Sequence, residues 1–96
     1  MTTTTIATLD VNSTIPTSGV LVAAGDFDLD VSGPFGAISI VIERSVDDVN
    51  ANYTPVVALD GPKSVFIKNV GAHYYRVRKR TGIGDSTTNI LVRAIQ

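Results

Sequence analysis

The sequence predicts an all-β fold: a single antiparallel β-sandwich, immunoglobulin-like or jelly-roll-like, of about eight strands with little or no helix. β-branched residues are abundant, and they fit a pleated sheet better than a helix. Apolar and polar residues alternate in several runs, whereas no stretch keeps the 3.6-residue period of an amphipathic helix. With 96 residues, 44% of them hydrophobic, the chain is expected to form one domain, residues 1–96, around one core.

The order of the strands follows from the turn signals that separate them. Glycine, proline, asparagine and aspartate predict turns at residues 16–19, 25–26, 33–34, 47–52, 60–62, 71 and 81–86. The strands are predicted at residues 4–10, 19–23, 26–32, 36–44, 53–59, 63–68, 73–80 and 88–95. In three of the later strands, alternation places a set of residues on one shared face: Ile38, Ile40 and Ile42; Tyr75 and Val77; and Ile90, Val92 and Ala94.

The chain begins with a run of threonines, Thr2 to Thr5. Residues 1–5 are predicted to be either a flexible tail or an arm that adds to the sheet edge of a neighbouring subunit. The start lacks the basic region and apolar core of a signal peptide, and no apolar run reaches the roughly 20 residues of a membrane-spanning helix. We therefore expect a soluble, non-secreted or self-assembling domain with no membrane partner.

The sequence predicts no enzyme, no cofactor and no metal site. Cysteine is absent, and the one histidine, His73, begins a strand in a chain that has no glycine-flanked serine. Asp26, Asp28 and Asp30 alternate with large apolar residues, so their carboxylates are spaced roughly 6.5–7 Å apart along a strand and do not converge on one calcium ion. A pI of about 5.6 and the lack of a GxxxxGK[ST] loop disfavour nucleic acid and nucleotide partners.

Charge is distributed unevenly along the chain. Residues 1–48 hold seven acids against one base, and residues 49–96 hold two acids against seven bases. Two explanations are open: ion pairs between neighbouring strands of one sheet, or contact between the acidic face of one copy and the basic face of another. The candidate interface residues are Asp26, Asp28, Asp30, Arg76, Arg78 and Arg80.

Five motifs resemble those of small β-sandwich structural proteins of tailed bacteriophages. They are IERSVDD (42–48), NYTPV (52–56), GPKSV (61–65), HYYRVR (73–78) and NILVRAI (89–95), and the likeness as a whole extends over most of the chain. The sequence departs from the pattern at VNAN (49–52) and Tyr53, where such proteins tend to have a glycine-rich hairpin and a tryptophan. A hairpin is still expected there, with a different turn.

The resemblance implies a non-enzymatic virion protein, made in the cytoplasm of the bacterial host, that binds the major capsid protein or other virion proteins. A homo-oligomeric capsid decoration (cement) protein on the capsid surface is the first expectation, and a tail or head–tail joining protein is the alternative. A carbohydrate- or receptor-binding fibre module is a further alternative, disfavoured by the lack of tryptophan. The resemblance also implies that Arg44 caps its strand near Asp47 or Asp48, and that Tyr74 or Tyr75 makes a tyrosine-corner contact.

Overall fold

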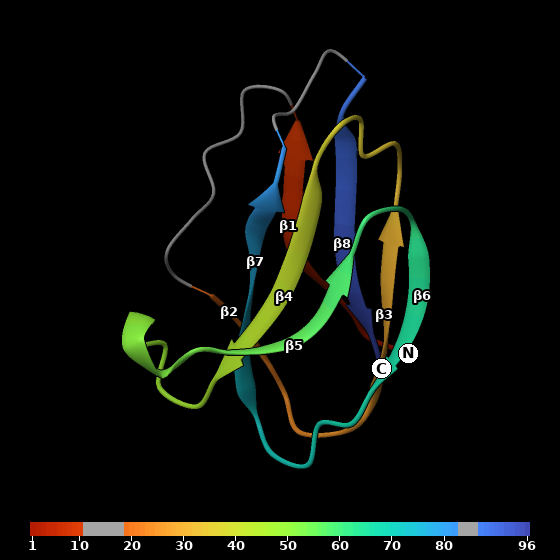
Figure 1. Cartoon of the computed structure of the whole chain (residues 1–96). Helices are drawn as coiled ribbons and strands as arrows, with labels where there is room; N and C mark the ends of the chain where they lie inside the picture. The colour runs from red at the N-terminus through yellow and green to blue at the C-terminus, as the bar shows by residue number, and fades with distance from the viewer. Residues whose placement is uncertain (11–18, 83–86) are drawn as a thin grey trace.

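The computed structural model describes residues 1–10, 19–82 and 87–96, and their fold is all-β (Figure 1). The strands, in chain order, are β1 (Thr3–Asp10), β2 (Val20–Val22), β3 (Phe27–Ser32), β4 (Ser39–Ser45), β5 (Thr54–Leu59), β6 (Lys63–Ile67), β7 (His73–Thr81) and β8 (Asn89–Ile95). A single 3-10 turn, η1 (Asn50–Asn52), lies between β4 and β5. The described residues contain no helix with the length and apolar character needed to cross a membrane.

The strands form two antiparallel sheets that pack face to face as a sandwich (Figure 1). Sheet A has the strand order β1-β8-β3-β6, and sheet B has the order β2-β7-β4-β5. Consecutive strands lie in different sheets at every connection except the one between β4 and β5, which both belong to sheet B. The edge strands are therefore β1 and β6 in sheet A and β2 and β5 in sheet B.

The core lies between the two sheets because each strand directs alternate side chains inward. In β3, Phe27, Leu29 and Val31 are buried, whereas Asp28 is exposed. Phe27 meets Tyr75 of sheet B edge to face, with ring centroids 5.2 Å apart, so aromatic packing joins the two sheets. Within the described residues, the core consists of Ile6, Leu9, Val22, Phe27, Leu29, Val31, Phe35, Ile38, Ile40, Ile42, Leu59, Ile67, Tyr75, Val77, Ile90, Val92 and Ala94.

The predicted fold class is confirmed, and each predicted strand is present with ends displaced by three residues or fewer. The largest difference is at the start of β4, which begins at Ser39. Gly36 has a φ of 64°, and the Ile38 amide donates a hydrogen bond to the Phe35 carbonyl, so a turn occupies the residues before the strand. The turns predicted at residues 16–19 and 81–86 fall mostly on residues 16–18 and 83–86, outside the described residues.

The N-terminal threonines pair within their own chain. Thr3, Thr4 and Thr5 lie opposite Ile95, Ala94 and Arg93 of β8. The backbone of Thr2 exchanges two hydrogen bonds with Gln96, at 2.9 and 2.8 Å. Residues 3–5, part of the segment expected to be a flexible tail or a partner-binding arm, thus belong to β1, which is an edge strand of sheet A.

Candidate functional site

The acidic candidates lie on or beside β3 in sheet A. The side chain of Asp30 lies opposite Arg93 of β8 and accepts a hydrogen bond from its Nη2 atom at 2.5 Å. Asp26 precedes β3 and accepts a hydrogen bond from the backbone amide of Asn69 at 2.8 Å. Asp28 is exposed on the outer face of sheet A, and its side chain has no ion pair with any described residue. One of the three carboxylates is therefore free.

The basic candidates lie on β7 in sheet B, so the acidic strand and the basic strand belong to different sheets and do not pair. Arg78 and Arg80 are exposed. Arg76 is not available as an interface residue, because it is 3% exposed and forms an ion pair with Glu43 of β4. Ion pairs between neighbouring strands thus explain part of the charge pattern. Asp30 pairs with Arg93 in sheet A, and Arg76 pairs with Glu43 in sheet B.

The guanidinium of Arg76 contacts groups from β4 and from the loop after it. Its Nε donates to Glu43 Oε1 at 2.9 Å, directly across the β4–β7 ladder. Its Nη1 donates to Asn50 Oδ1 at 2.8 Å. Its Cζ lies 3.8 Å from the centroid of the Tyr53 ring, which is the geometry of a cation–π contact. The buried charge is therefore compensated by an anion, an amide oxygen and an aromatic face.

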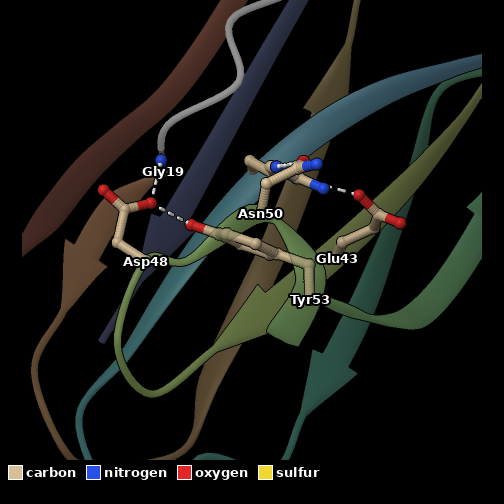
Figure 2. A network of polar contacts seen from close by, with 6 residues as sticks. Gly19, Glu43, Asp48, Asn50 and Tyr53 are labelled. Carbon is tan, nitrogen blue, oxygen red and sulfur yellow. Dashed lines mark hydrogen bonds and ion pairs between the residues drawn. The ribbon is translucent and has the colours of Figure 1, made fainter.

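Tyr53 connects this cluster to Asp48. Figure 2 shows the Tyr53 hydroxyl directed at Asp48, and the hydroxyl donates a hydrogen bond to Oδ1 of that carboxylate. The same oxygen accepts a hydrogen bond from the Gly19 amide at 2.7 Å. A Cβ at Gly19 would lie 2.2 Å from the Tyr53 hydroxyl oxygen, so this approach requires glycine. We name Gly19, Glu43, Asp48, Asn50, Tyr53 and Arg76 the Arg76 cluster.

Hydrogen bonding shifts the titration of two members of this cluster. The bond from the Tyr53 hydroxyl, and after it the bond from the Gly19 amide, hold the pKa of Asp48 below its usual value, and the charge of Arg76 acts in the same direction. Burial first, and then the neighbouring carboxylate of Asp48, raise the pKa of Tyr53. Asp48 has a φ of 57°, a left-handed conformation that aspartate tolerates better than most residues.

Asp47 stabilises the loop between β4 and β5 through hydrogen bonds to nearby residues. Its Oδ1 accepts hydrogen bonds from Ser45 Oγ at 2.7 Å and from the Val49 amide at 3.1 Å. Its Oδ2 accepts one from Asn52 Nδ2 at 2.7 Å. These bonds, led by that of Ser45, lower the pKa of Asp47. Asp47 thus connects residues within and beside the loop. Asp48 connects the loop to Gly19, which directly precedes β2.

A second buried polar group, Asn69, lies before the start of β7. Its side chain is fully buried; Nδ2 donates to the Ala23 carbonyl at 2.8 Å and Oδ1 accepts a bond from the Tyr75 hydroxyl at 3.0 Å. Tyr75 therefore makes a contact similar to a tyrosine corner, with a side chain six residues upstream in place of the backbone. His73 Nδ1 lies 2.9 Å from Asn69 Oδ1 and 2.7 Å from the Gly71 carbonyl, which gives this histidine a structural environment.

The implied role of Arg44 is wrong. Its Nη1 donates to the Lys68 carbonyl at 3.0 Å and lies 3.5 Å from the Tyr75 hydroxyl, and no contact joins it to Asp47 or Asp48. Arg44 is paired with Tyr75 in the β4–β7 ladder, so its side chain extends toward the loop after β6, away from the loop after β4. Arg44 thus makes its hydrogen bonds next to Asn69, near the start of β7.

The sequence analysis did not identify several residues that form hydrogen bonds or ring contacts with the candidate residues. Glu43, Tyr53 and Asn69 were not singled out as functional or structural polar residues, although each contacts a residue that was. The polar run from Asp47 to Asn52 indicated a loop, but gave no sign that the loop folds back over sheet B. Among residues 1–10, 19–82 and 87–96, no group of three or more His, Cys, Asp or Glu is placed to hold a metal ion.

Comparison with known proteins adds no relative: no protein-family model, no curated protein and no solved structure matches the chain.

Proposed function

We propose that the protein is a non-enzymatic structural component of a tailed-phage virion, a capsid decoration protein that binds the major capsid lattice. The motifs that resemble phage β-sandwich proteins motivate the proposal, and the fold class that they imply is the observed one. The further support comes from the charged side chains that the fold leaves without a partner.

The observation that carries the proposal is the opposite sign of the free charges on the two outer faces. Asp28 is exposed on the outer face of sheet A, and Arg78 is exposed on that of sheet B, with Arg80 exposed two residues further along β7. Two outer faces with exposed charges of opposite sign suit a subunit that is held between or upon other protein subunits. Such charges set orientation and association rate more than affinity.

The tyrosines disfavour the carbohydrate alternative. Tyr75 is fully buried and Tyr53 is 9% exposed, both in structural contacts, and Tyr74 is half-buried. A sugar platform would need an open aromatic face with polar flanks, and these three residues do not offer one. A position on the tail or at the head–tail joint remains the nearest alternative within the structural class.

The test is binding of the recombinant protein to empty phage heads, measured by co-sedimentation across a salt series. The R78E/R80E variant should lose binding at low salt, because a basic face would meet an acidic surface on the lattice. K63E/K68E is the matched control, since it makes the same change in net charge at exposed positions on and beside β6.

Cryo-electron microscopy of purified virions then locates the domain. Density on the head lattice supports the decoration protein, and density confined to the tail or the joint assigns the protein to the alternative. Failure to sediment with heads and tails alike, together with binding on a glycan array, would refute the structural proposal.

A further inference from the structure

Phe66, on edge strand β6 of sheet A, carries the exposed aromatic ring of this fold. The chain has three phenylalanines and three tyrosines, all within the described residues, and the other five are buried or half-buried. Phe66 is 65% exposed, so its ring keeps most of its apolar surface in water. A single exposed apolar side chain is ordinary, and the groups around the ring therefore decide whether it forms a binding site.

A carboxylate lies beside this ring. Asp28 of β3 is directly opposite Phe66 in the β3–β6 ladder, and both side chains are exposed on the outer face of sheet A. Directly opposite residues of an antiparallel pair have Cβ atoms about 4.5–5.5 Å apart, so the two side chains are neighbours. On its other side, Asp28 lies opposite Ile95 of β8, which is half-buried. The carboxylate thus has an aromatic and an aliphatic neighbour, and we name Asp28, Phe66 and Ile95 the Phe66 site.

The basic residues near the Phe66 site do not neutralise its charge. Asp28 forms no ion pair with any described residue. Arg93 lies on the same face, in the adjacent row, and is already paired with Asp30 at 2.5 Å. Lys68, the exposed residue that follows β6, is in no ion pair with Asp28 either. An exposed anion next to an aromatic ring is complementary to a cation.

Sheet B contains the complete form of this arrangement. Its Arg76 has Cζ 3.8 Å from the centroid of the Tyr53 ring, and Nε donates a hydrogen bond to Glu43 at 2.9 Å. Glu43 lies directly opposite Arg76 in the β4–β7 ladder. A ring and a carboxylate together thus hold one guanidinium in this protein. The Phe66 site supplies a ring and a carboxylate in the same way, but the guanidinium is absent from it.

We propose that the Phe66 site binds an arginine side chain of a different protein. The guanidinium stacks on the ring of Phe66 and pairs with Asp28, and the aliphatic stem packs toward Ile95. Arginine fits the site better than lysine, because its planar group stacks on aromatic rings and can donate two N–H groups to one carboxylate. A sugar fits it less well, because both neighbours of Asp28 in the row are apolar and offer a hydroxyl no hydrogen bond.

The arginines that the chain itself exposes suit the site less well than those of another protein. Arg78 lies on the outer face of sheet B, so a second copy would have to stack its sheet B on sheet A of the first copy. Such a contact is heterologous, and it continues from copy to copy into a fibre unless the rotation closes a ring. A different protein ends the series after one contact. The inference does not depend on the phage assignment.

Titration with N-acetyl-arginine amide, followed by the amide chemical shifts of the protein, tests the site with a minimal occupant. At low salt, the shifts should saturate with a dissociation constant on the order of 10 mM and concentrate on β3 and β6 around the Phe66 site. N-acetyl-norvaline amide, an uncharged compound with a similar stem, should not shift these residues. No saturation up to about 100 mM, or equal shifts with the norvaline compound, would overturn the proposal.

Substitutions separate the ring from the charge. F66L and D28N should each raise the dissociation constant about 2–5-fold, as expected for the loss of an exposed cation–π contact or of a surface ion pair. F66Y keeps a ring and should bind as the wild type does. D60N, the matched charge control at an exposed residue of the turn between β5 and β6, should leave binding unchanged. Equal weakening by D28N and D60N would show attraction to net charge alone and would refute the site. Circular dichroism of each variant establishes that it is folded.

A dilution series of the protein without ligand identifies the source of the arginine. If the partner is a different protein, the shifts of β3 and β6 should not depend on protein concentration up to about 1 mM. Concentration-dependent shifts at the Phe66 site that disappear in R78E/R80E would assign the site to a second copy, and would overturn the proposal of a different partner.

Discussion

Replacement of Arg76 by methionine is expected to destabilise the fold strongly. Methionine keeps the unbranched aliphatic stem but removes the charge and the donors. The variant loses a charge-assisted hydrogen bond to Glu43, worth about 1.5–3 kcal/mol, and a bond to Asn50, worth about 1 kcal/mol. It also loses the cation–π contact with Tyr53, worth about 0.5–2 kcal/mol.

These contributions are not additive, and the expected loss in the free energy of unfolding is about 3 kcal/mol. Removing one partner of a buried ion pair costs about 3–5 kcal/mol when the other charge stays buried. Here the side chain of Glu43 keeps 17% of its surface exposed, so its carboxylate recovers part of its hydration and the loss lies at the lower end. For a domain of this size, that corresponds to a fall in Tm of roughly 12–24 °C.

Urea and thermal unfolding followed by circular dichroism measure the effect. R78M is the matched control, because Arg78 is two residues further along β7 and exposed, and its substitution should change stability by about 0.5 kcal/mol or less. The double variant E43Q/R76M should be more stable than the sum of the single effects predicts, since no lone carboxylate remains. If R76M and R78M unfold within about 0.5 kcal/mol of each other, the Arg76 cluster does not stabilise the fold as argued.

Three further predictions concern the loop between β4 and β5. G19A should lower the free energy of unfolding, measured in urea, by about 1–3 kcal/mol, because its methyl group would lie 2.2 Å from the Tyr53 hydroxyl oxygen. The double variant G19A/Y53F should recover part of that loss, because it lacks the hydroxyl. The folded-state pKa values of Asp47 and Asp48 are lowered, so the stability that these carboxylates contribute is complete above the unfolded values near 3.8 and is lost as the pH falls below them. In an unfolding series from about pH 6 to about pH 2, D48N should therefore lose less stability than the wild type. The pKa of Tyr53 is raised, so stability should fall above about pH 10, where the unfolded tyrosine ionises, and Y53F should not show that part of the fall.

The strands were predictable because their signal is local. Ile38, Ile40 and Ile42 alternate with more polar residues, and a strand with one buried face requires that alternation wherever it lies in the sheet. Boundaries were less predictable where turn geometry intervenes, as at Gly36, since the positive φ that delays β4 is a property of the folded turn. Local pattern thus gave the elements, and turn conformation decided where they start.

The site was less predictable because a strand pattern gives the face of a side chain, but not what covers that face. Arg76 occupies an outward position on β7, as the alternation indicates, yet it is buried because the loop carrying Tyr53 folds over it. Its pairing with Glu43 depends on β4 and β7 being neighbours, which is a property of the topology. No spacing in the sequence encodes that adjacency.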